Sequence, residues 1–176
     1  MVSELIETSR DALRGDLEER VQALLDDAFP RGSSTKGGYY SLHGVPDRIL
    51  IAHEARHVVG HLALYQRQVK IGEEVLEIGM IGGVAVAPDH RRKGHCRLLL
   101  LRAHDYLRAG SIPFSILFAF EPRVYLSSGY RLMQNETHFL DVDGAWKTFV
   151  YRGSMYSELA RRPWPNQMLE LGGGVV

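Results

Sequence analysis

The residues from Val84 to Cys96 carry the clearest chemical signal in this sequence. They read Val-Ala-Val-Ala-Pro-Asp-His-Arg-Arg-Lys-Gly-His-Cys, so an apolar run stops at Pro88 and a basic loop follows it. An amphipathic run with helical spacing begins near Gly94. The first backbone N–H groups of a helix have no intrahelical acceptor and lie at the positive end of the helix dipole. This junction therefore predicts an anion-binding site.

The residue types inside the loop fit that chemistry. Gly94 allows the main chain to approach an oxygen atom with no side chain in the way. Arg91, Arg92 and Lys93 add charge-assisted hydrogen-bond donors. Without the strand before them and the helix after them, these three cations are typical of an ordinary solvated surface.

The residues around the start of the helix are also candidates for contact with the anion. His95 and Cys96 fall in its first turn, where the free N–H groups lie. We expect the side chains of His90 and His95 to face water. Cys96 is interpreted as a small residue under the helix, because nothing nearby pairs a nucleophile with a base.

A second motif, with the pattern of a metal site, lies between His53 and His57. The residues His-Glu-Ala-Arg-His match the zinc-binding pattern His-Glu-x-x-His, and His61 follows four residues later. Two histidines four residues apart bind one metal ion when a helix places them on one face. Both flanks here are β-rich and predict a hairpin, which separates the two imidazoles. We therefore expect no metal site and keep a metal-dependent hydrolase as an alternative.

The spacing Val86-x-Pro88-x-x-Arg91-x-x-Gly94-x-Cys96 resembles the coenzyme A signature of the GNAT N-acetyltransferases. That signature has Arg or Gln, two residues, Gly, one residue, and then Gly or Ala; here Cys96 occupies the last position. The stretch from Arg123 to Tyr130 is similar to the family's Phe-Tyr-x-x-x-Gly-Phe segment. The Asn that is common near the end of the preceding strand is replaced by Phe118 to Phe120.

The resemblance implies a mixed α/β GNAT fold, with a central, mostly antiparallel sheet flanked by helices. It implies acetyl-CoA as cosubstrate, with no metal. The pantetheine arm would lie along the backbone of Val84, Ala85 and Val86, and the rest of the coenzyme would bind at Arg91 to Cys96.

The resemblance also implies the reaction, which is direct attack by the primary amine of a small molecule or peptide on the thioester carbonyl. An N–H near Val84 would stabilise the developing oxyanion, and Tyr125 would protonate the departing thiolate. Glu77, on the strand before the glycines, is the candidate base. A looser likeness, through Gly82-Gly83 and the Pro-Trp-Pro of the tail, is to aminoglycoside 2'-N-acetyltransferases and nodulation N-acyltransferases.

The elements that must position these residues follow from periodicity and turn residues. The stretch Arg31 to Gly44 is expected to be a loop that covers a site. The expected helices are 16–28, 92–108 and a short one within 122–129. The expected strands are 3–9, three consecutive antiparallel strands at 48–54, 58–69 and 75–87, then 112–120, 138–142 and 148–151.

Composition limits the remaining choices. The 176 residues are 45% hydrophobic, which fits one domain over residues 1–176. Lys plus Arg equals Asp plus Glu at 21 each, so no net charge favours nucleic acid or a membrane. The single cysteine excludes an internal disulfide, and without a signal peptide or membrane span we expect a cytoplasmic protein. The sequence leaves the oligomeric state open, with a homodimer among the options.

One alternative from another functional class is a catalytically silent coenzyme A-binding or regulatory module on the same fold. A nucleoside triphosphate enzyme is disfavoured because the chain lacks Gly-x-x-x-x-Gly-Lys-Ser/Thr.

Overall fold

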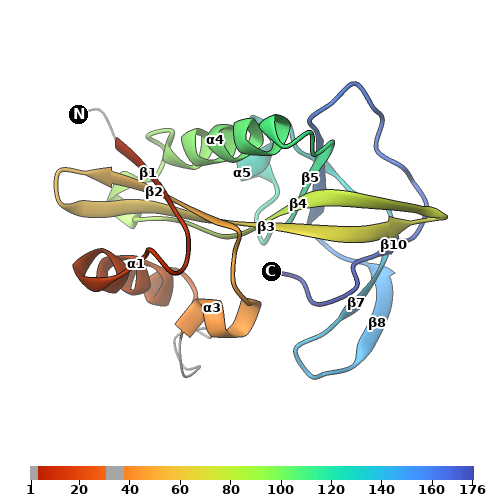
Figure 1. The fold of residues 1–176 in the computed structure, drawn as a ribbon, viewed down its shortest axis with the longest axis horizontal. Helices are drawn as coiled ribbons and strands as arrows, with labels where there is room; N and C mark the ends of the chain where they lie inside the picture. The colour runs from red at the N-terminus through yellow and green to blue at the C-terminus, as the bar shows by residue number, and fades with distance from the viewer. Residues whose placement is uncertain (1–3, 31–37) are drawn as a thin grey trace. The chain divides into compact units, whose positions relative to one another are not determined.

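The computed structural model describes residues 4–30 and 38–176 and has a mixed α/β fold (Figure 1). The chain forms two compact units, which we describe separately. Unit 1 lies within Met1–Tyr65 and Gly82–Ala103, and unit 2 comprises Gln66–Ile81 and His104–Val176. Among the described residues, no helix has the length and apolar character needed to cross a bilayer.

Unit 1 contains an antiparallel sheet with helices. Its elements are β1 (Glu4–Thr8), α1 (Gly15–Ala28), α3 (Gly38–His43), β2 (Arg48–Glu54), the first part of β3 (His57–Ile71), the last part of β4 (Glu74–Val86), the 3-10 turn η1 (Pro88–His90) and the first part of α4 (His95–Ala109). Strand β2 pairs with β1 and β3, with Ile51 opposite both Ile6 and His61. The α1 side chains Val21, Leu24 and Leu25 are buried, as their helical spacing requires.

Neighbouring residues of β3 show how helices cover both faces of this sheet. Successive side chains of a strand point to opposite faces. A Cβ atom at Gly60 would lie 3.1 Å from Leu99 of α4, so α4 packs closely against this glycine. The next residue, His61, contacts the α3 residue Tyr40. Helices α4 and α3 therefore lie on opposite faces of β3.

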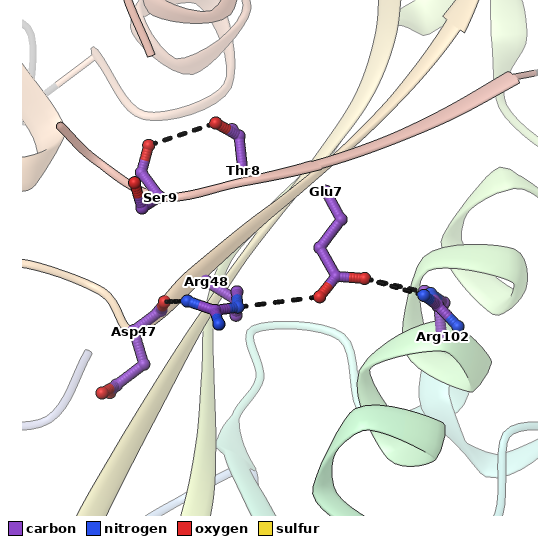
Figure 2. Close-up of polar contacts among 6 residues, drawn as sticks. All are labelled: Glu7, Thr8, Ser9, Asp47, Arg48 and Arg102. Carbon is purple, nitrogen blue, oxygen red and sulfur yellow. Dashed lines mark hydrogen bonds and ion pairs between the residues drawn. The ribbon is translucent and has the colours of Figure 1, made fainter. Parts of the chain in front are cut away.

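An acidic residue of β1 connects the edge of the sheet to α4. Glu7 lies between two arginines, with its Oε2 atom 2.9 Å from Nη2 of Arg102 and its Oε1 atom 3.6 Å from Nε of Arg48 (Figure 2). The guanidinium of Arg48 also donates to the Asp47 carbonyl. All three charged side chains are partly exposed, so this network orients α4 more than it adds stability.

Unit 2 surrounds a short apolar strand. Its elements are the remaining parts of β3, β4 and α4, then β5 (Phe114–Phe118), α5 (Arg123–Leu126), β6 (Arg131–Leu132), β7 (Glu136–Leu140), β8 (Trp146–Val150), β9 (Ser154–Glu158) and β10 (Leu169–Glu170). Strand β5 runs parallel to β4 and antiparallel to β9, which also pairs with β6. Strand β10 lies between β3 and β7, and β7 forms an antiparallel pair with β8.

A buried polar network lies in unit 2. The hydroxyl of Tyr130 lies 2.6 Å from the Ser115 hydroxyl and 3.0 Å from Nε2 of His104. All three residues are buried. Burial lowers the pKa of His104 to about 4, and the nearby Arg108 adds to that effect.

The predicted fold class and the order of its main elements are confirmed. Four details were wrong or missed, including the two-residue strand β6. Residues 38–43 form helix α3 although a loop was expected, and the rest of that expected loop lies largely outside the described residues. Strand β9 was missed because Ser-Met-Tyr-Ser-Glu is short and half polar, and β10 was missed because it has two residues.

We predict that the protein loses stability as the pH falls from 7 to 5. Burial lowers the pKa of His61, like that of His104, to about 4. The unfolded chain takes up protons near pH 6.5 that the folded protein cannot accept, so its free energy of unfolding falls below that pH. The expected loss is on the order of 2 kcal/mol per histidine at pH 5.

Urea unfolding at several pH values measures this loss. His104→Gln should remove about half of the slope, since one of the two histidines no longer titrates. His57→Gln, the same change at an exposed position, is the matched control. Equal stability at pH 7 and pH 5 in the unmodified protein would contradict the prediction.

Candidate coenzyme site

The turn between β4 and α4 has a defined main-chain path in unit 1. The N–H of Ala87 donates to the Val59 carbonyl at 2.9 Å, which holds the end of β4 against β3. Pro88 then begins η1, and Nε of Arg91 donates back to the Val86 carbonyl at 3.2 Å. The loop is thus attached at both ends of the 3-10 turn.

Two residues with positive φ turn the chain into α4. Arg92 has φ 63° and Gly94 has φ 90°, both in the left-handed region. The Gly94 carbonyl accepts the N–H of Leu98 at 3.0 Å, so Gly94 is the residue at which the helical hydrogen bonds begin. A Cβ atom at Gly94 would meet nothing within 4 Å, so there is open space beside its backbone.

Basic side chains surround this helix start. Arg91, Arg92 and Lys93 are all exposed, as is Gly94 itself. Amide N–H groups, the helix dipole and three cations therefore meet at one exposed turn, a combination suited to a phosphate or pyrophosphate. The structure brings together, within unit 1, every predicted coenzyme residue from Val84 to Cys96.

The two histidines that flank the basic loop differ in burial. His95 is 4% exposed, so the prediction that its side chain faces water was wrong. Its Nε2 atom lies 3.4 Å from Oε1 of Glu54, and Nε2 of His90 lies 3.6 Å from the other oxygen. One carboxylate at the end of β2 thus contacts both histidines that flank the basic loop. His95 remains a candidate coenzyme residue through its backbone N–H.

Cys96 fits its predicted role as a small residue. Its thiol is free and partly buried, and burial raises its pKa to about 11. The thiol therefore stays protonated at neutral pH, which argues against a nucleophile.

The His-Glu-x-x-His pattern lies on a hairpin, as predicted. His53 is on β2 and His57 begins β3, so the two imidazoles do not share a helical face. Nε2 of His53 lies 3.4 Å from a Glu4 oxygen. Across residues 4–30 and 38–176, no group of three or more potential metal ligands occurs. The glutamate of the motif, Glu54, contacts His90 and His95.

The strand segment before the loop contains a glycine with positive φ, Gly83. Gly83 has φ 57°, and a Cβ atom there would come within 3.0 to 3.1 Å of Tyr39 and His61. The Gly83 carbonyl accepts a hydrogen bond from Nδ1 of His61 at 2.7 Å. After it, Val84 and Val86 are half-buried and Ala85 is buried. The role of His61 was not predicted, because its only signal in the sequence is a histidine in an apolar strand.

The two predicted catalytic side chains lie in unit 2. Tyr125 is half-buried on α5, with its ring edge-on to Tyr130 at a centroid distance of 6.1 Å. Tyr130 is itself fixed by Ser115 and His104, so the ring against which Tyr125 packs is held firmly. Glu77 lies on β4 and is exposed to solvent.

Comparisons with known proteins agree with this geometry. Residues 10–133 match the family model described as acetyltransferase (GNAT) domain. No curated protein matches the sequence. The GNAT family N-acetyltransferase YhbS from Escherichia coli, solved with CoA, is 17% identical with a TM-score of 0.68. That match covers 96% of this chain and 89% of the other.

Two further structures share the fold. A GNAT family acetyltransferase from Brucella melitensis, solved with acetyl-CoA, is 14% identical with a TM-score of 0.61 and covers 94% of each chain. A probable N-acyltransferase from Enterococcus faecalis is 15% identical with a TM-score of 0.64, over 77% of this chain. The match spans only 33% of the Enterococcus chain. Because the family model matches well over half of the sequence, this chain belongs to the GNAT acetyltransferase family.

Proposed function

We propose that this protein transfers an acetyl group from acetyl-CoA to a primary amine. The observation that carries the proposal is the turn at Gly94, where a left-handed glycine, three cations and the start of α4 meet. Family membership supports the same activity. The CoA and acetyl-CoA present in the Escherichia coli and Brucella melitensis structures agree with the choice of coenzyme.

In this proposal the main chain does most of the binding. The pyrophosphate binds the N–H groups at the start of α4, and Arg91, Arg92 and Lys93 neutralise its charge. The pantetheine arm forms hydrogen bonds with the backbone of Val84, Ala85 and Val86 like an added strand. His95 and Cys96 contribute N–H groups, which explains why a buried imidazole and a neutral thiol are acceptable there.

The chemical step is nucleophilic addition followed by loss of thiolate. The unprotonated amine forms a C–N bond to the thioester carbonyl, and the carbonyl oxygen gains negative charge that the Val84 N–H stabilises. The C–S bond then breaks, and Tyr125 gives its proton to the departing sulfur. Glu77 takes the proton lost by the amine, acting through water. The products are an N-acetylated amine and free CoA thiol.

We predict that Gly94→Glu strongly weakens coenzyme binding while the fold survives. The new side chain enters open space, but its carboxylate faces the pyrophosphate. Gly94→Gln is the matched control, since it has the same size and the same backbone strain without the charge. In calorimetric titration with CoA, the Glu variant should bind at least about tenfold more weakly than the Gln variant. Equal affinity of Glu, Gln and unmodified proteins would place the pyrophosphate elsewhere.

We predict that Tyr125→Phe lowers kcat and leaves the KM for acetyl-CoA nearly unchanged. The ring and its packing on Tyr130 remain while the acidic proton is lost. General acid catalysis typically contributes about two to four orders of magnitude, so the fall should lie in that range. Release of free thiol is measured with an acceptor found in a panel of amines, amino sugars and peptides. Tyr156→Phe, which keeps its ring stacked on Trp164, is the control and should retain activity. Full activity in the Tyr125 variant would remove this residue from the mechanism.

A further inference from the structure

A buried chain of hydrogen bonds ends on the peptide group that precedes Val84. The Tyr40 hydroxyl lies 2.6 Å from Nε2 of His61, and Nδ1 of His61 lies 2.7 Å from the Gly83 carbonyl oxygen. His61 is fully buried and Tyr40 is 8% exposed. The chain joins α3, β3 and β4 within unit 1.

The direction of each hydrogen bond is fixed by chemistry. A carbonyl oxygen only accepts, so Nδ1 of His61 carries the hydrogen. Burial lowers the pKa of His61 to about 4, so the ring is neutral at pH 7 and has no second hydrogen. Nε2 therefore accepts, and the Tyr40 hydroxyl donates. Burial also raises the pKa of Tyr40, which keeps that hydroxyl protonated.

The accepting carbonyl belongs to the same peptide unit as the Val84 N–H. All described peptide bonds are trans, and in a trans peptide the C=O and N–H bonds point in opposite directions. A hydrogen bond that fixes the Gly83 carbonyl toward His61 therefore directs the Val84 N–H away from His61. It also polarises the peptide, which makes that N–H a stronger donor.

The local packing limits rotation of this peptide. Gly83 has a φ of 57°, and a Cβ atom there would make tight contacts of 3.0 to 3.1 Å with Tyr39 and His61. Tyr40 is held in turn by Arg10, whose guanidinium carbon lies 5.3 Å from its ring centre and which pairs with Glu18. On its carbonyl side the peptide is therefore held by two buried side chains, His61 and Tyr40.

We infer that His61, supported by Tyr40, is a positioning residue that orients and polarises the Val84 N–H for the thioester oxygen. The inference rests on the proposed function, in which that N–H stabilises the oxyanion. Neither side chain touches the substrate; both act through the Gly83–Val84 peptide. These two hydrogen bonds therefore affect the reacting carbonyl more than they affect binding of the coenzyme.

The test is the infrared band of bound acetyl-CoA, isotope-labelled at the thioester carbonyl, because it needs no acceptor amine. A donor aimed at the oxygen moves this band to lower frequency than in free acetyl-CoA. His61→Phe and Tyr40→Phe should both reduce that shift, and His61→Asn, which keeps an N–H for Gly83, should restore part of it. His57→Phe, the same change at an exposed position of β3, should leave the shift unchanged.

Kinetics add a second measurement. The His61→Phe variant should lose roughly tenfold or more in kcat, less than the hundredfold to thousandfold typical of deleting an oxyanion donor, with little change in KM. Tyr40→Phe covers the case in which His61→Phe fails to fold. A normal band shift in variants that bind acetyl-CoA would overturn this inference and leave the proposed function intact. If the unmodified protein does not bind acetyl-CoA, both the inference and the proposed function are wrong.

Discussion

The main chain between Gly83 and Gly94 is the feature on which the rest of this structure depends. A β strand and a helix start present backbone N–H groups that a ligand with carbonyl and phosphate oxygens can use. Those groups can bind a ligand only if their directions are fixed. Gly83 and Gly94, both with positive φ, set the path of the main chain at the two ends of the segment. The required conformations, more than particular side chains, define the candidate site.

The surroundings of this segment hold it from several sides. His61 binds the Gly83 carbonyl, Val59 accepts the Ala87 N–H, and Glu54 contacts His90 and His95. The Glu7 network attaches α4 to the edge strand β1 (Figure 2). In binding sites whose groups must be preorganised, polar residues that do not contact the ligand commonly hold the groups that do. His61 on β3, His90 on η1 and His95 on α4 thus each contact a group that lies in this segment or beside it.

Sequence reasoning identified the coenzyme turn because its signal is local. The strand, basic loop and helix are contiguous, and the spacing from Val86 to Cys96 is specific. It also predicted the hairpin that separates His53 from His57. It missed the roles of Glu54, His61 and Tyr40, because their partners lie 21 to 41 residues away in the chain. Strands β9 and β10 were missed for the same reason, since pairing with β5 or β7 decides whether short polar segments become strands.

A crystal structure of the protein with CoA tests the central claim most directly. We predict that the pyrophosphate oxygens lie within hydrogen-bond distance, about 3 Å, of the N–H groups between Arg92 and Cys96. The pantetheine amides should pair with the backbone of Val84 to Val86. A pyrophosphate bound elsewhere on the protein, with the turn at Gly94 empty, would contradict the account.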